Sequence, residues 1–299
     1  ILVATSGDTG GAVAAGFYKT PGIEVIILYP SGKVSDLQEK QLTTLGENIT
    51  AVEIEGTFDD CQALVKEAFL DTELNKKYHL SSANSINIAR LIPQSFYYFE
   101  AYKQIKKYGK EVVFSVPSGN FGNLTAGLMA KRMGLPVKRF IAATNINKIV
   151  PEYLSSGIYN PKPSQATISN AMDVGNPSNF VRILDLYNKD FVAISKDVSG
   201  FWLDDNETKE AMKEAYQKYR YICDPHGAIG YKSLHNLDAN EIGLFLETAH
   251  PAKFLDTVES TLDIKIEIPE GLASIADKTK QAIKMESDFQ SFKSYLLLR

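Results

Sequence analysis

Residues 116–130, with the sequence VPSGNFGNLTAGLMA, have the residue types and spacing of a phosphate-binding turn. An apolar run ends at Pro117, polar and glycine residues follow, and an apolar stretch rich in small residues comes next. Glycines at 119 and 122 permit positive φ angles and close backbone approach, so successive N–H groups can face one anion at a helix start. The alternative is a tight strand-to-helix turn that binds no ligand.

A second turn of this kind follows the apolar residues 1–4. Its sequence, TSGDTGG at residues 5–11, places glycines and short polar side chains where a helix is expected to begin. The first N–H groups of a helix lack intrahelical partners, and the helix dipole adds partial positive charge there. The turn is therefore either an anion site or a connection between a strand and a helix that binds no ligand.

Neither turn has the pattern of a nucleotide-binding loop. The spacing G-x-G-x-x-G is absent, and Gly32-Lys33 lacks both the leading glycine and the following Ser or Thr of a P-loop. A nicotinamide-dependent or P-loop enzyme is not favoured.

Two further positions have side chains that do chemistry. Thr248 follows the apolar residues 243–246, where parallel sheets bind ligands, but it also suits the N-cap of a helix ending near Leu262. His226, in Asp224-Pro-His-Gly, is interpreted as a helix-start residue in preference to a general base. Cys223 and His226 have the spacing Cys-x-x-His, but the sequence has no second pair of ligands to go with them. A metal site is therefore not predicted.

A polar stretch, SANSINIAR at residues 82–90, precedes an apolar helix pattern. Helix capping explains some of these side chains. It does not explain Arg90, one turn into that helix.

These positions need a scaffold, and the chain alternates apolar β-branched runs with helical patterns, which is typical of parallel βαβ units. The predicted strands are residues 1–4, 24–29, 50–54, 111–116, 140–143 and 243–246. The predicted helices are residues 35–45, 59–70, 86–107 and 207–219. The stretch 151–179 is rich in Pro, Ser and Asn and too long for a simple connection, so we expect it to be functional.

Composition excludes several classes of function. The 299 residues carry a net charge of -4, which does not favour nucleic acid as a partner. No apolar run approaches 18 residues, so no membrane span is expected. Two cysteines suit a reducing cytoplasm. The first residue is Ile1, already in an expected strand, and we expect an N-terminal part of the protein to be missing.

Several long motifs together resemble the threonine synthase family, pyridoxal-phosphate enzymes of the tryptophan-synthase-β (type II) fold. The motifs occur in the family's order over nearly the whole chain: ATSGDTGGAVA, SANSINIARL, VPSGNFGNLTAGLMAKRMGLPVKRFIAATN, ISNAMDVGNPSNF and FLETAHPAKF. Asp8 stands where most relatives of this fold carry Asn, which resembles the threonine synthase branch in particular.

The resemblance implies an α/β fold with two open, mainly parallel twisted sheets flanked by helices. It places the substrate-carboxylate turn in a smaller lobe, residues 1–95, and the cofactor phosphate loop in a larger lobe, residues 96–299.

The resemblance also assigns roles to individual residues. Thr248 matches the hydroxyl that meets the pyridine nitrogen of pyridoxal 5'-phosphate. The loop matching the cofactor-phosphate site comprises Gly119, Asn120, Phe121, Gly122 and Asn123. The turn matching the substrate-carboxylate site comprises Thr5, Ser6, Gly7, Asp8 and Thr9. Residues assigned to the cofactor ring or the substrate phosphate are Asn84, Ser85, Asn87 and Arg90.

The implied reaction converts O-phospho-L-homoserine and water to L-threonine and phosphate. The family's Schiff-base lysine lies in a Phe-Lys-Asp-Phe-like motif upstream of the first turn, before Ile1, and Lys189-Asp190-Phe191 is a chance match in the wrong part of the chain. We therefore expect these 299 residues alone to be inactive. The alternatives are another type II lyase, such as a threonine dehydratase or a cysteine synthase, and a non-catalytic phosphate-ligand binding module.

Overall fold

The computed structural model describes residues 1–5, 7–85 and 87–299. This part of the chain divides into two compact units, the first formed by Ile1–Asn84 with Glu267–Arg299 and the second by Ser85–Ile266. In the described ranges, no helix has both the length and the apolar character needed to cross a membrane.

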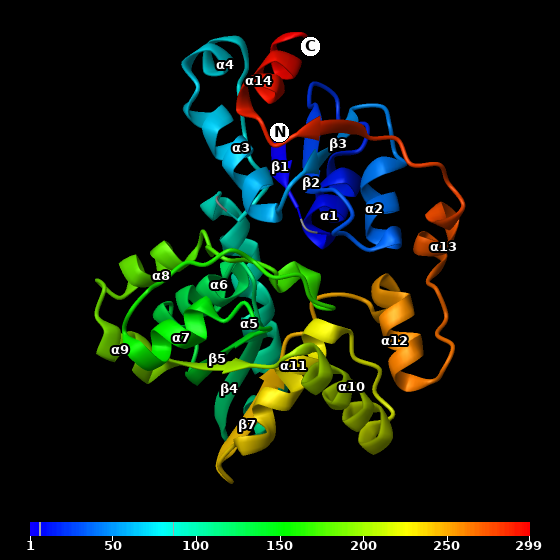
Figure 1. Ribbon diagram of the computed structural model, residues 1–299. Coiled ribbons are helices and arrows are strands. Elements are labelled where there is room, and N and C mark those ends of the chain that lie inside the picture. Colours follow the sequence, from blue (N-terminus) through cyan, green and yellow to red (C-terminus); the bar gives the residue numbers. More distant parts are fainter. Residues whose placement is uncertain (6, 86) are drawn as a thin grey trace. The chain divides into compact units, whose positions relative to one another are not determined.

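The first unit is built on a parallel sheet in the order β1-β2-β3-β8. Every residue of β2 is buried, which explains its continuous apolar run. Figure 1 shows β8 and α14, in red, lying beside elements from the start of the chain. The strands are β1 (Leu2–Ala4), β2 (Val25–Pro30), β3 (Ile49–Glu55) and β8 (Ile283–Glu286). The helices are α1 (Asp8–Phe17), α2 (Asp36–Thr43), α3 (Phe58–Leu70), α4 (Thr72–Lys77), α13 (Glu270–Ala276) and α14 (Phe289–Leu297).

The second unit is built on a parallel sheet in the order β6-β5-β4-β7. Its strands are β4 (Glu111–Pro117), β5 (Val137–Thr144), β6 (Val198–Trp202) and β7 (Glu241–Phe245). Its α-helices are α5 (Leu91–Ile105), α6 (Gly122–Arg132), α7 (Ile149–Ser156), α8 (Phe180–Leu186), α9 (Phe191–Asp197), α10 (Asp205–Tyr219), α11 (Pro225–Ser233) and α12 (Leu255–Leu262). Short 3-10 turns are η1 (Ile88–Arg90), η2 (Lys106–Tyr108), η3 (Asn170–Met172), η4 (Leu234–Asn236) and η5 (Pro251–Phe254).

The core of the second unit holds the start of α6 in place. Tyr98 on α5 is fully buried, and its ring meets Phe114 and Phe140 edge-on with centroids 5.0 and 5.9 Å apart. Its hydroxyl donates to the carbonyl of Asn123, 2.6 Å away, in the first turn of α6. A Cβ at Gly127 would lie 2.7 Å from both Tyr98 and Phe140, so glycine permits this close packing. The glycine-rich loop is therefore anchored to the aromatic core.

The sequence predictions of six strands are confirmed with small shifts in their bounds, whereas β6 and β8 were not predicted. Strand β6 contains Ser199 and Gly200 and follows α9 without a connecting loop. Strand β8 is four residues long and mostly exposed. Both lack the apolar pattern of a buried strand. The helix predicted over residues 86–107 begins instead with η1 and ends with η2, and Ile86 lies outside the described residues.

The observed units differ from the lobes expected at residues 1–95 and 96–299. The first unit ends at Asn84, and the last residues of the chain return to it. Their return depends on the pairing of β8 with β3, from Val52 opposite Ile283 to Glu55 opposite Glu286.

Candidate active site

The glycine-rich loop lies between the carboxyl end of β4 and the first turn of α6, as the sequence predicts. Phe121 is the N-cap of α6 and adopts the left-handed conformation, with φ 59°. Ser118 donates to the side-chain carbonyl of Asn123, 2.7 Å away, and the Asn123 amide donates back to Pro117. These bonds fix the loop from both ends.

The loop presents backbone donors that nothing in the described residues satisfies. Those N–H groups belong to Gly119, Phe121, Gly122 and Asn123. They gather at the start of an eleven-residue helix, where the helix dipole adds positive potential. A buried loop with unsatisfied donors at this position fits a phosphate group. The residues present are therefore suited to the phosphate of pyridoxal phosphate.

Side chains outside the predicted set complete this loop. Asn179 is fully buried, and its amide donates to the hydroxyl of Ser85 at 2.7 Å and the carbonyl of Asn120 at 3.0 Å. The side-chain carbonyl of Asn120 accepts from the hydroxyl of Ser178, 2.9 Å away. Arg182 donates to the carbonyl of Ser85 at 2.7 Å and brings positive charge. The motif ISNAMDVGNPSNF contained two of these residues, but no local pattern assigned them a role.

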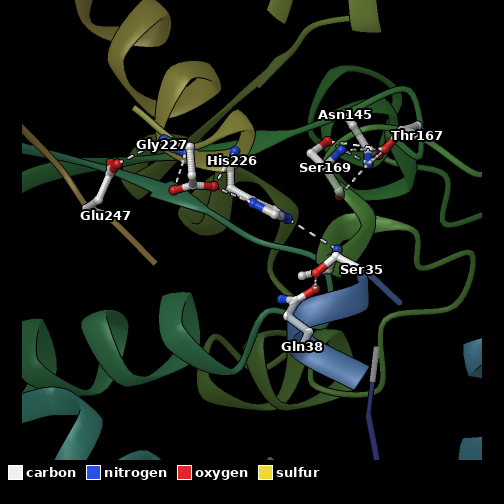
Figure 2. A network of polar contacts seen from close by, with 10 residues as sticks. Ser35, Gln38, Asn145, Thr167, Ser169, His226, Gly227 and Glu247 are labelled. Carbon is white, nitrogen blue, oxygen red and sulfur yellow. Dashed lines mark hydrogen bonds and ion pairs between the residues drawn. The ribbon is translucent and has the colours of Figure 1, made fainter. Parts of the chain in front are cut away.

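Gly119 packs directly against the segment 169–174. A Cβ at Gly119 would overlap the carbonyl oxygen of Ala171 and lie 2.9 Å from Met172 Cα. Glycine is thus required here by close backbone approach rather than by φ. The backbone N–H of Ala171 donates to His226 Nε2, 3.2 Å away (Figure 2).

The segment 169–174 is also held by a buried polar cluster centred on Asn145 (Figure 2). The Asn145 amide donates to the Thr167 hydroxyl at 2.8 Å, the Ser169 hydroxyl at 3.2 Å and Asp173 Oδ1 at 2.9 Å. Burial raises the pKa of Asp173 to about 7, and hydrogen bonds from Thr167 and Asn145 limit the rise. The stretch 151–179 singled out in the sequence thus contributes most of this cluster.

Asp224 and Glu247 link the end of β7 to the start of α11. Asp224 is the N-cap of α11 and accepts from the backbone N–H groups of His226 and Gly227. The backbone N–H of Asp224 donates to Glu247 Oε1, 3.3 Å away. Much of Glu247 is exposed, but its carboxyl group lies over Gly227, where a Cβ would be 2.8 Å from Oε1. Burial of that group, reinforced by the charge of Asp224, raises the pKa of Glu247 to about 8.

We expect Glu247→Gln to remove a pH-dependent loss of stability. Because the folded pKa of about 8 lies above the ordinary 4.5, this group's contribution is complete below about pH 4.5 and is lost as the pH rises through 8. Glutamine keeps the acceptor for Asp224 and carries no charge. The melting temperature of the variant relative to the parent should therefore increase from pH 6 to pH 9. The same dependence of melting temperature on pH in both proteins would contradict this. Glu210→Gln on α10 is the control.

Thr248 follows Glu247 beyond the carboxyl end of β7 and is exposed. The alternative interpretation of Thr248 as the N-cap of the following helix is wrong, because His250 caps η5 and α12 begins only at Leu255. His226 lies in the first turn of α11, as interpreted from the sequence. Within the described residues no group of His, Cys, Asp and Glu side chains is arranged to hold a metal ion.

The turn after β1 belongs to the first unit. The Thr5 hydroxyl accepts from the backbone N–H groups of Gly7 and Gly10, at 3.0 and 2.9 Å, and donates to the Gly7 carbonyl. Asp8 and Thr9 are half-buried in the first turn of α1, and Ser6 lies outside the described residues. Gly7 has φ 151°, and a Cβ there would lie 2.6 Å from Gln38 Nε2. Thr5 therefore shapes the turn.

The stretch 82–90 is divided between the two units. Asn84 is buried in the first unit, where its amide accepts from the backbone N–H of Ala4 and donates to its carbonyl. In the second unit Ser85 contacts the glycine-rich loop, and Asn87 caps η1 by accepting from the Ala89 N–H. Arg90 is half-buried, which lowers the pKa of its guanidinium. The contacts of the described residues place Ser85 at the loop.

The comparisons with known proteins match this geometry. The family of pyridoxal-phosphate-dependent enzymes matches residues 1–244, and the family described as threonine synthase, C-terminal, matches residues 227–296. A threonine synthase of Haemophilus influenzae is 52% identical over 299 residues, covering 99% of this chain and 70% of the relative. The chain belongs to the threonine synthase family. A threonine synthase of Escherichia coli is 50% identical, with 99% of this chain and 69% of the relative covered.

Solved structures agree with the family assignment. The crystal structure of threonine synthase from Escherichia coli has a TM-score of 0.96 and 49% identity, covering all of this chain and 70% of that one. The pyridoxal-phosphate-bound threonine synthase from Brucella melitensis has a TM-score of 0.85 and 34% identity, covering 99% and 69%. The predicted type II fold with two parallel sheets is confirmed, and so are the cofactor and the lyase class.

More distant neighbours share only the fold. Maize serine racemase has a TM-score of 0.62 at 17% identity, and a tomato threonine deaminase has 0.60 at 16%. The alternatives of another type II lyase and of a non-catalytic binding module are therefore not favoured.

Proposed function

We propose that the substrate of this threonine synthase is O-phospho-L-homoserine, which reacts with water to give L-threonine and phosphate. The observation that carries the site assignment is the set of unsatisfied backbone donors at the start of α6, in a chain of this family. Pyridoxal phosphate, when bound, delocalises the negative charge left as protons leave the α and then the β carbon of the substrate. The protein supplies binding, orientation and electrostatics.

The loop Gly119–Asn123 holds the cofactor phosphate in this proposal. Its N–H groups and the dipole of α6 stabilise the charge of the phosphate. Arg182 adds positive potential through Ser85, which it contacts at 2.7 Å. Burial of Asn179 against Ser85 and Asn120 keeps these donors in a fixed arrangement.

Thr248 is the residue that meets the pyridine nitrogen. A neutral hydroxyl accepts or donates one hydrogen bond and does not enforce protonation of the ring, so it tempers the withdrawal of electrons. We expect Thr248→Val to lower kcat/KM about tenfold, because the hydrogen bond proposed between this hydroxyl and the ring nitrogen is lost. Thr248→Ser should retain the parent value. Equal activity of the valine and serine variants would contradict this role.

The turn Thr5–Thr9 receives the substrate carboxylate. The Thr5 hydroxyl and the start of α1 support this role, because the hydroxyl fixes the N–H groups of Gly7 and Gly10 where that helix begins. Asn84 supports the same turn through both polar groups of Ala4. Ser85, Asn87 and Arg90 are proposed for the cofactor ring or the substrate phosphate, with Arg90 providing the positive charge.

The test is phosphate release from O-phospho-L-homoserine by the complete gene product that contains these residues, with pyridoxal phosphate supplied. Equal amounts of phosphate and threonine are the expected result. Absence of both products while the cofactor is bound would contradict the proposed substrate. The 299 residues alone should form no threonine, because the family's Phe-Lys-Asp-Phe-like lysine motif does not occur among them.

We also propose a cytoplasmic location. Cys61 and Cys223 are both buried as free thiols, which suits a reducing compartment. Fractionation of cells that produce the tagged protein is the direct measurement.

A further inference from the structure

We infer that His226 is a positioning residue that sets the cofactor-phosphate loop through the backbone of Ala171. This inference rests on the proposed role of Gly119–Asn123. It concerns a buried side chain outside the set of residues proposed above to bind the cofactor or the substrate. His226 is only 2% exposed, and its ring nitrogens contact Asp224 and the backbone of Ala171. Figure 2 shows His226 in one polar network with Gly227 and Glu247.

Hydrogen bonds at both ring nitrogens of His226 indicate its tautomer. Nε2 accepts from the backbone N–H of Ala171 at 3.2 Å, so this nitrogen keeps its lone pair. Nδ1 lies 2.5 Å from Asp224 Oδ1 and therefore carries the proton. Asp224 is itself fixed, because it accepts the first backbone N–H groups of α11. The acid thus selects the tautomer that can accept from Ala171.

Ala171 transmits this placement to the loop by contact. Its carbonyl oxygen lies so close to Gly119 that a Cβ there would overlap it, so a shift of Ala171 changes where Gly119 can lie. The opposite side of the segment 169–174 is held by the bonds of Asn145 to Ser169 and Asp173. The segment is therefore fixed from two sides, and His226 is the contact from α11.

The same pair also reaches the other end of the proposed cofactor site. The backbone N–H of Asp224 donates to Glu247, which directly precedes Thr248. The buried His226–Asp224 pair therefore connects Glu247, which precedes Thr248, to Ala171. Ala171 in turn packs against Gly119 of the phosphate loop. This arrangement keeps a constant spacing between the two ends of a rigid ligand.

The experiment compares two substitutions of His226, each of which keeps a polar group at the position of one ring nitrogen. His226→Gln places a carbonyl oxygen near Nε2 and preserves the acceptor for Ala171, whereas His226→Asn reaches only as far as Nδ1. Pyridoxal phosphate is titrated into the complete apo gene product, and the ³¹P shift of the bound phosphate is recorded. We expect His226→Asn to weaken binding about tenfold and to move the ³¹P signal, because an unsatisfied Ala171 N–H shifts the segment. His226→Gln should stay within about threefold of the parent, because its acceptor is retained.

Controls separate positioning from stability. His235→Asn changes an exposed histidine in η4 that bonds Glu214 on α10, and it should leave the titration unchanged. Asp224→Asn keeps the helix cap and should weaken binding about threefold, since a neutral amide holds the tautomer less firmly than a carboxylate. This variant decides the question if His226→Asn does not fold.

The outcomes distinguish the two proposals. Equal affinity and an unchanged ³¹P signal in His226→Asn or Asp224→Asn would overturn the positioning role. Equal weakening in the glutamine and asparagine variants, in parallel with their apo melting temperatures, would overturn it as well. Failure of the parent protein to bind pyridoxal phosphate would instead overturn the proposed site.

Discussion

Gly119→Ala should lower the affinity for pyridoxal phosphate about a hundredfold, because it displaces the N–H groups that face the phosphate by the better part of an ångström. A Cβ at this position overlaps the carbonyl oxygen of Ala171 and comes within 2.9 Å of Met172 Cα. Both neighbours are backbone atoms, which cannot rotate away as a flexible side chain does. The strain also costs about 1–3 kcal/mol of stability. Titration of the apo protein with the cofactor, at a temperature where circular dichroism shows it folded, measures the effect.

Gly16→Ala is the matched control. Gly16 lies on the exposed face of α1, and a Cβ there has no neighbour within 4 Å. Alanine at this helix position should raise stability by up to about 1 kcal/mol and leave cofactor affinity unchanged. A cofactor affinity of Gly119→Ala within about threefold of the parent would show that the loop does not hold the phosphate.

Asn145→Ala should lower the free energy of unfolding by about 3 kcal/mol or more, because several buried groups lose their partner at once. Asn145 is 1% exposed, and its amide donates to Thr167, Ser169 and Asp173. Its side-chain carbonyl accepts from the backbone N–H of Asn147 at 2.9 Å. Alanine replaces none of these bonds. The buried Asp173 carboxyl keeps its bonds from Thr167 and Asn147, and the Asn147 N–H loses its acceptor. Urea unfolding, with the slope compared between proteins, gives the value.

Asn236→Ala provides the comparison for this effect. Asn236 is exposed in η4, and its replacement should change stability by less than about 0.5 kcal/mol. A loss below about 1 kcal/mol in Asn145→Ala would mean that the cluster contributes little net stability. Since the cluster holds the segment that packs on Gly119, we also expect the asparagine variant to bind the cofactor more weakly.

The chemistry-bearing loop was predictable from the sequence because its signal is local. The strand at 111–116, the glycines at 119 and 122 and the small-residue helix are consecutive, so their preferences combine within one short segment. The left-handed conformation of Phe121 is the exception. The same holds for the turn after β1. The long family motifs then identified the cofactor, since no periodicity distinguishes one phosphate ligand from another.

Tertiary structure alone decided which distant residues support that loop. Asn179 reaches Ser85 across 94 positions of the chain, and His226 reaches Ala171 across 55. Sequence read in isolation shows only that Asn179 is polar and that His226 begins a helix. Their partners depend on packing, because a side-chain hydrogen bond forms only where the fold brings two buried groups into register.

The return of the chain's end to the first sheet was decided in the same way. Strand β8 has four residues, three of them exposed, so its own pattern is too weak to predict a strand. Its pairing with β3 supplies the missing stability. The sequence determined the local elements and the chemistry they carry, because conformational preference and hydrophobic period act over a few residues. The fold determined the positioning network, because burial and hydrogen bonding act between residues that only packing brings together.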